Sequence, residues 1–113
     1  YLNAVMGDKG IYTSVDDMFK FDQSLDNFTL LPDSILSEAF IPGNPSYWKR
    51  KDNYGFGWRV KEDRDSTVFH FGWWKGFRSY FIKVMDKNQT IVVLNNVKRG
   101  RFLNIDRLIE LIN

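Results

Sequence analysis

The chain has 113 residues, of which 43% are hydrophobic and 27% charged, a composition typical of globular domains and not of disordered segments. Its net charge of +2 is too small to indicate nucleic-acid binding. It has no cysteine and one histidine, so disulfides and thiolate metal sites are excluded, and we expect no metal and no cofactor. No stretch approaches the length of a membrane span.

Two helices are predicted in the first half of the chain, over residues 14–26 and 33–40. Ser14 and Asp17 have the spacing of a helix N-cap and its partner. Four apolar residues of the first helix recur at helical spacing and predict its buried face: Val15, Met18, Phe19 and Leu25. Phe21 lies off this stripe and is expected to pack against a second surface.

The second half reads as strands. Alternating and β-branched patterns predict strands over 54–61, 66–73, 77–85 and 89–97, followed by a helix over 102–112. The strand around Thr90 to Leu94 is apolar on both faces, which is typical of an interior strand. The sequence therefore predicts an α+β fold, with an antiparallel sheet of about four strands and flanking helices.

Residues 66–85 form the centre of this arrangement, as a strand, a tight turn at Gly76 and a second strand. Successive side chains of a strand alternate in direction, so two sets are expected on opposite faces: Val68, His70 and Gly72 on one, and Phe69, Phe71 and Trp73 on the other. The single histidine thus stands two residues before a glycine that leaves the backbone open to a ligand.

Four pieces of sequence occur in one order and spacing: residues 10–21, residues 54–58, His70-Phe71-Gly72 with Gly76-Phe77, and residues 92–96. Together they resemble the C-terminal portion of the serine β-lactamase-like hydrolase superfamily, which includes class C β-lactamases, DD-peptidases, D-aminopeptidases and related esterases. The resemblance spans roughly residues 7–112. It implies that residues 1–113 are a single partial domain, the C-terminal section of a larger hydrolase domain with the β-lactamase/transpeptidase-like fold.

The resemblance also implies a site. In that family a Ser-x-x-Lys motif supplies the nucleophile, a Tyr-x-Asn motif transfers protons, and a Lys-x-Gly or His-x-Gly strand closes the cleft. His70 and Gly72 match the last motif. By resemblance, His70 shapes the hydrogen bonding around the serine and substrate, Gly72 allows close approach of the substrate, and the N–H of Trp73 completes the oxyanion hole.

We expect the other two motifs to lie outside this chain. Tyr1-Leu2-Asn3 spells Tyr-x-Asn, but it stands directly before the Gly10 block, whereas the family's motif precedes that block by a long helical stretch. Without a nucleophile and a base there is no acyl-enzyme chemistry, so this chain is expected to be inactive by itself. The parent reaction would be acyl transfer from an amide or ester to water.

The resemblance further implies partners. The missing N-terminal part of the same protein would pair with strand 89–97, which is otherwise an exposed edge and a template for a homodimer of the fragment. The substrate would be a small amide or ester, with β-lactam, D-amino-acid peptide and plain ester all open. Many relatives act outside the cytoplasm, so a periplasmic or extracytoplasmic location is favoured by resemblance only.

Parts of the sequence also suggest two other classes of function. A non-catalytic binding module would use four tryptophans as a ligand platform: Trp48, Trp58, Trp73 and Trp74. An RNA-binding strand is suggested by Lys75 to Ile82, but Arg78 and Ser79 stand where that signature requires a small residue and an aromatic. The basic run from Lys98 to Arg101 is interpreted as a solvated turn, so no nucleic-acid partner is expected.

Overall fold

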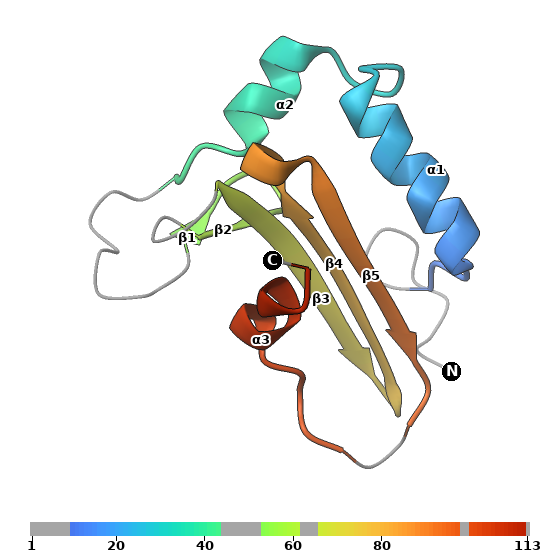
Figure 1. Ribbon diagram of the computed structural model, residues 1–113. Helices are drawn as coiled ribbons and strands as arrows, with labels where there is room; N and C mark the ends of the chain where they lie inside the picture. The colour runs from blue at the N-terminus through green and yellow to red at the C-terminus, as the bar shows by residue number, and fades with distance from the viewer. Residues whose placement is uncertain (1–9, 44–52, 62–65, 98–99, 113) are drawn as a thin grey trace.

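The computed structural model describes residues 10–43, 53–61, 66–97 and 100–112. Along the chain the elements are α1 (Val15–Asp26), α2 (Asp33–Ala39), β1 (Asn53–Tyr54), β2 (Arg59–Lys61), β3 (Thr67–Trp74), β4 (Phe77–Val84), the 3-10 helix η2 (Met85–Lys87), β5 (Gln89–Asn95) and α3 (Ile105–Glu110). The strands form one antiparallel sheet in the order β1-β2-β3-β4-β5. The predicted α+β class is confirmed (Figure 1).

The predicted single strand over 54–61 is a hairpin instead, which gives the described sheet five strands. Gly57 turns the chain with a φ of +77°, and the Gly55 amide donates to the Trp58 carbonyl oxygen at 2.8 Å. A side chain at Gly55 would lie 1.9 Å from the carbonyl oxygen of Ala39 at the end of α2, so only glycine fits. The expected alternation of faces across this segment is therefore wrong.

Strands β3 and β4 form the predicted central hairpin, with eight residue pairs from Thr67↔Val84 to Trp74↔Phe77. Lys75 and Gly76 make the two-residue turn with φ angles of +43° and +96°. Positive φ at both central positions is the type I′ geometry that matches the twist of antiparallel strands. The sequence located this turn because glycine accepts such angles, although Lys75 adopts one too.

The helices cover both faces of the sheet: α1 and α2 lie on one side and α3 on the other (Figure 1). The core on the α3 side is built from Phe69, Ile82, Val84 and Ile109. The core on the α1 and α2 side is built from Leu25, Leu36 and Phe81, with Trp58 and Val92 packed against it. The predicted alternation along β3 is confirmed, because Phe69 and Phe71 pack on the α3 side.

The buried face of α1 differs from the predicted stripe. Val15 and Phe19 are 51% and 56% exposed, whereas Phe21 packs edge-on against Phe81 with ring centroids 5.7 Å apart. Leu25 is buried as expected. The predicted N-cap is confirmed, since the Ser14 hydroxyl accepts from the Asp17 amide at 3.1 Å.

The C-terminal helix is shorter than its apolar stripe suggested. The Asn104 side chain accepts from the Arg107 amide and caps the helix, so residue 102 lies before it. The Phe102 ring packs against aromatic side chains of the sheet, with its centroid 5.8 Å from that of Phe71. Phe102 thus contributes to packing without being helical.

Strand β5 ends the described sheet and pairs with β4 alone. It was predicted as an interior strand from its apolar faces, and its residues are mostly half-buried. Residues 1–9, most of the polar loop with Tyr47 and Trp48, the turn over 62–65, and Lys98-Arg99 lie outside the described ranges. Among the helices that are described, none has the length and apolar character needed to cross a membrane.

Candidate functional site

His70 lies in the middle of β3, on the face that carries α1 and α2. Val68, two residues earlier on that face, is 0% exposed under the helices, whereas His70 is exposed. Partial burial of the imidazole lowers its pKa below the ordinary 6.5, and the positive charge of Arg59 lowers it further. The ring is therefore neutral at pH 7. It has no hydrogen-bond partner within the described part of the chain.

Gly72 lies on the same face, directly opposite Ser79 of β4. A Cβ atom built on Gly72 would lie 2.6 Å from the Ser79 Oγ, which is closer than real Cβ contacts allow. The space over the Gly72 Cα is therefore occupied by a serine hydroxyl of the neighbouring strand.

The Trp73 side chain points to the opposite face from His70. Its ring lies 6.5 Å from that of Phe102 and the residue is 61% exposed. Trp58 packs in the core between Phe40 and Phe81, at 5.5 and 5.6 Å. The described tryptophans therefore share no single surface that would serve as a ligand platform; Trp48 lies outside the described residues.

One edge of β3 is unpaired beyond Phe69. Strand β2 pairs with Thr67, Val68 and Phe69 only, so the described sheet offers no partner to the following residues on that side. In a two-residue hairpin the residues flanking the turn, Trp74 and Phe77, form a hydrogen-bonded pair. Pairs alternate along an antiparallel ladder, so the N–H and C=O of Trp73 point away from β4 and toward this free edge.

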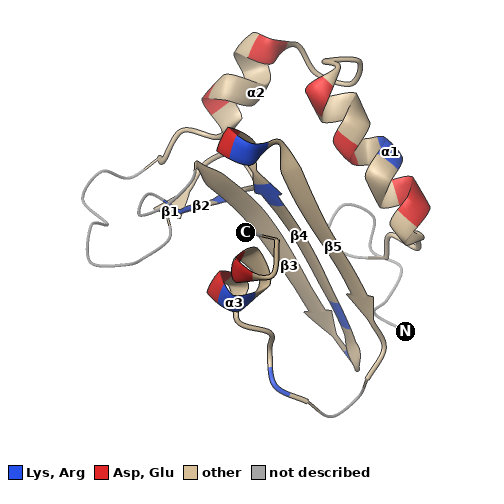
Figure 2. Cartoon of the chain, in the orientation of Figure 1, with Lys and Arg blue, Asp and Glu red and all other residues tan. Residues whose placement is uncertain are grey.

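A second group of polar residues lies farther along the same face, where α1 crosses the sheet. The Lys83 ammonium contacts Asp22 at 2.9 Å and Asp26 at 2.7 Å, and the Thr90 hydroxyl donates to Asp22 at 2.8 Å. The side chains of Lys83 and Asp22 are only 7% and 9% exposed. Figure 2 shows the acidic residues along α1 and a basic segment on β4 near the end that leads to the 3-10 helix.

Burial by itself would lower the pKa of Lys83. Hydrogen bonds and charges from Asp26 and Asp22 outweigh burial and raise that pKa above its ordinary value. The cluster is thus a partnered ionic contact between α1 and the sheet, and its groups hydrogen-bond one another. Within the described ranges, no group of three or more His, Asp or Glu side chains is arranged to hold a metal ion.

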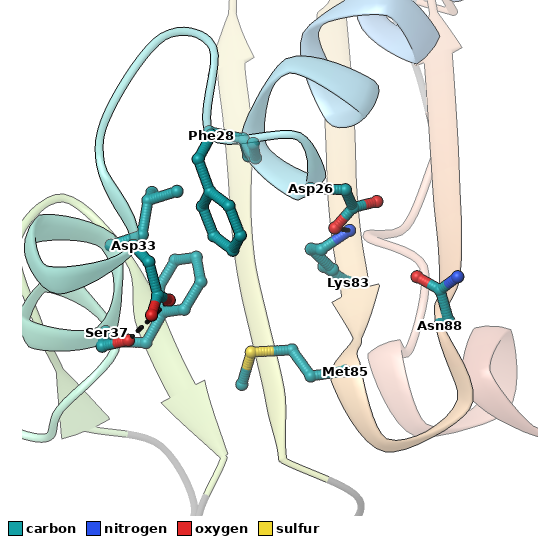
Figure 3. A pocket seen from close by; sticks show the side chains of 10 residues that line it. Asp26, Phe28, Asp33, Ser37, Lys83, Met85 and Asn88 are labelled. Atoms are coloured by element: carbon teal, nitrogen blue, oxygen red, sulfur yellow. Dashed lines mark hydrogen bonds and ion pairs between the residues drawn. The ribbon is translucent and has the colours of Figure 1, made fainter.

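A pocket of about 240 Å³ opens beside this cluster, between α2, the end of α1 and the β4–β5 connection (Figure 3). Phe28 points its ring into the pocket, and Met85 lies at its floor. Asp33 on the rim accepts a hydrogen bond from Ser37 at 3.1 Å. The pocket lies at the covered end of the sheet, so it belongs to the packing of α1 and α2 and does not include His70.

Two features of this face were missed by sequence reasoning. The ionic cluster had a signal, because Asp22 stands between Met18 and Leu25 on the buried side of α1 and Lys83 interrupts an apolar strand. A buried charge on each of two elements predicts that they pair. Ser79 had no such signal, since only the strand register places it opposite Gly72.

One sequence expectation needs correction. We expected the Ser-x-x-Lys motif to be absent, yet Ser46-Tyr47-Trp48-Lys49 has that spacing. It lies outside the described residues, between Pro45 and a run of basic residues. It follows the Gly10 block, whereas by resemblance the family's nucleophile opens a helix far upstream. The order of motifs therefore argues against Ser46 as the nucleophile.

Comparison with known proteins decides the family. A family model described as Beta-lactamase matches residues 1–112. The chain belongs to the beta-lactamase family. This membership agrees with the predicted resemblance, and the α+β arrangement of sheet and helices is consistent with part of the beta-lactamase-like fold.

Two curated proteins are similar to this chain. Penicillin-binding protein 4* of Bacillus subtilis (strain 168) is 30% identical over 98 residues, which are 85% of this chain and 22% of that protein. D-aminopeptidase of Gluconobacter oxydans (strain 621H) is 30% identical over 96 residues, 80% of this chain and 17% of that protein. The chain thus spans about a fifth of the length of these relatives. No solved structure matches it.

Proposed function

We propose that this chain is the C-terminal section of a serine hydrolase that transfers an acyl group from an amide or ester to water. In this proposal residues 1–113 are a partial domain, and the β3 segment from His70 to Trp73 forms one wall of the active-site cleft. The observation that carries the proposal is the free edge of β3, where an exposed neutral histidine, a glycine and an outward-pointing amide follow one another.

The Trp73 amide is the proposed oxyanion donor. Its N–H is directed away from β4 by the alternation of the ladder, and β2 ends before it. A backbone donor fixed in a sheet needs no reorganisation when negative charge develops on the substrate oxygen. One such donor typically contributes about 2.7–4 kcal/mol to transition-state stabilisation.

His70 is the proposed polar group beside the reacting atoms. Because its pKa lies below 6.5, the ring at neutral pH carries one N–H donor and one nitrogen acceptor. A neutral imidazole can therefore accept from a serine or bind a substrate oxygen without adding a fixed charge. The nucleophile and its base are proposed to lie on the remainder of the protein, as the order of motifs implies.

Strand β5 is the proposed junction with the remainder of the protein. Its outer edge has no partner in the described sheet, and unpaired strand edges recruit other strands. In the full-length protein we propose that upstream strands of the same chain occupy this edge. The isolated chain is then expected to dimerise through residues 89–97, and sedimentation showing only monomer at high concentration would contradict this.

The proposed function is tested with the full-length gene product. A chromogenic β-lactam, a D-alanine p-nitroanilide and a p-nitrophenyl ester cover the three open substrate classes. We expect hydrolysis of at least one and covalent labelling of one serine by a fluorophosphonate or a penicillin. Mass spectrometry should locate the label upstream of Tyr1. A label on Ser46, or neither label nor hydrolysis, would overturn the proposal; Ser46→Ala serves as the control variant and should remain active.

A further inference from the structure

Ser79 is a polar residue on the candidate site's face that neither the sequence nor the family resemblance assigns. It lies on β4 opposite Gly72, and strand alternation places it on the same face as His70. His70 and Ser79 are diagonal neighbours across the ladder, a relation that separates residues by about 7–8 Å. A single substrate group of a few atoms can span that distance.

The Ser79 hydroxyl leans across the ladder toward β3. Its oxygen lies 2.6 Å from the place where a Cβ of residue 72 would be. Any other residue at position 72 would displace this oxygen by rotation of the serine side chain. The absence of a side chain at Gly72 is therefore what admits the hydroxyl over β3, one strand nearer to the free edge.

This hydroxyl is available to a ligand. Ser79 is half-buried and makes no hydrogen bond within the described residues. Its same-face neighbours along β4, Phe77 and Phe81, are apolar, and so is Leu94 opposite it on β5. A hydroxyl between apolar neighbours and beside an exposed imidazole is the typical make-up of a small-molecule site, where few polar groups fix orientation.

We propose that Ser79 is a substrate-binding residue, whose hydroxyl donates a hydrogen bond to a carbonyl or carboxylate oxygen of the substrate at a point away from the reacting carbon. The proposal rests on the proposed hydrolase function and adds to it a specificity contact. It also gives Gly72 a different role: glycine at this position makes room for the hydroxyl of Ser79, and the substrate approaches from the edge of β3.

The kinetic test compares Ser79→Ala, Gly72→Ala and the double variant in the full-length enzyme. A lost hydrogen bond to a non-reacting group raises KM with kcat unchanged, by about fivefold for a neutral donor. Gly72→Ala should cause the same rise because it displaces the same hydroxyl, and the double variant should be no worse than either. Ser79→Thr, which keeps a hydroxyl, should stay near wild type, and Ser37→Ala, on α2 away from the proposed site, is the matched control.

Two results would overturn the proposal. One is an unchanged KM in Ser79→Ala, whatever the effect of Gly72→Ala. If only Gly72→Ala raised KM, the glycine would serve the substrate directly. The other is a double variant in which the KM increases of Ser79→Ala and Gly72→Ala add. If the wild-type enzyme hydrolyses nothing, the proposed function fails, and crystallography decides whether the Ser79 hydroxyl lies over Gly72. Ser79 should then occupy one rotamer over Gly72 and change it in Gly72→Ala. A disordered Ser79 side chain in the wild-type protein would contradict this.

Discussion

One face of the sheet carries polar groups at both ends, and the two ends are built in opposite ways. At the covered end, Lys83, Asp22 and Thr90 are buried under α1 and hydrogen-bonded to one another. At the other end, His70 is exposed and Ser79 half-buried, and neither has a hydrogen-bond partner in the described part of the chain. Both ends lie on the same strands, so the helices above them make the difference.

We propose that this contrast separates a structural cluster from a binding surface. A buried charge requires partners, because leaving it unpaired costs several kcal/mol, and the Lys83 cluster meets that requirement within the protein. Polar groups that the protein leaves unpartnered at its surface remain free to pair with a ligand. The comparison predicts that variants of the first end change stability and variants of the second change activity.

The largest effect is expected for Lys83→Ala. Removing the ammonium leaves the Asp22 carboxylate, 9% exposed, without its counter-charge, and breaking a buried pair in this way costs about 3–5 kcal/mol of unfolding free energy. Urea unfolding measures the loss. Lys20→Ala is the matched control, because Lys20 pairs with Asp17 on the exposed side of α1 and should cost less than about 1 kcal/mol. Equal losses in the two variants would show that the cluster is not structural.

The second effect is expected at the open end. His70→Ala should leave the unfolding free energy within about 0.5 kcal/mol of wild type, since the side chain is exposed and unpartnered in the described ranges. Hydrolysis by the full-length protein should fall about tenfold, which corresponds to the loss of one hydrogen bond worth about 1.4 kcal/mol. A large loss of stability with unchanged kcat/KM would reverse the assignment of the two ends.

The third prediction compares the two acidic partners of Lys83 at the covered end. Asp26 also contacts Lys83, at 2.7 Å, but its side chain is 40% exposed, so solvent screens the pair. Asp26→Ala is expected to cost about 1 kcal/mol, and Asp22→Ala clearly more because it also strands the Thr90 hydroxyl. The order of the two losses in urea unfolding is the readout. A greater loss for Asp26→Ala would contradict the role of burial.

The smallest effects concern pH, and they have opposite signs at the two ends. The pKa of Lys83 is raised above 10.5, so its stabilisation is complete below pH 10.5 and is lost as pH rises through the higher folded value. The pKa of His70 is lowered below 6.5, so the unfolded chain binds the proton first and stability falls as pH drops below 6.5. NMR titration of the imidazole should give a midpoint under 6.5; a midpoint above it would contradict this account.

The central hairpin and its faces were predictable because they depend on local pattern. Alternation along β3 and a glycine at position 76 fix which residues share a face, and the structure agrees. The segment from Tyr54 to Lys61 was not predictable from its own alternation. The contact of Gly55 with Ala39, a residue outside the segment, and the turn at Gly57 decide it.

Some residues of the candidate site were likewise predictable from the sequence, and others were not. His70 and Gly72 were predicted as site residues by resemblance, which carries information from many related chains that physics applied to one sequence lacks. The burial of Asp22 was not predicted, because its partner Lys83 lies 61 residues away in sequence. Ser79 emerges only once the register is known. Long-range pairing was thus the missing information in each case.

The central claim is that the His70-to-Trp73 segment closes the cleft of a serine hydrolase. A crystal structure of the full-length protein with its serine acylated by a slow substrate tests it most directly. The account predicts the Trp73 amide nitrogen within about 2.7–3.1 Å of the acyl oxygen, with His70 in the same cleft. An acyl group remote from β3, or a Trp73 amide already bonded to another strand of the protein, would contradict it.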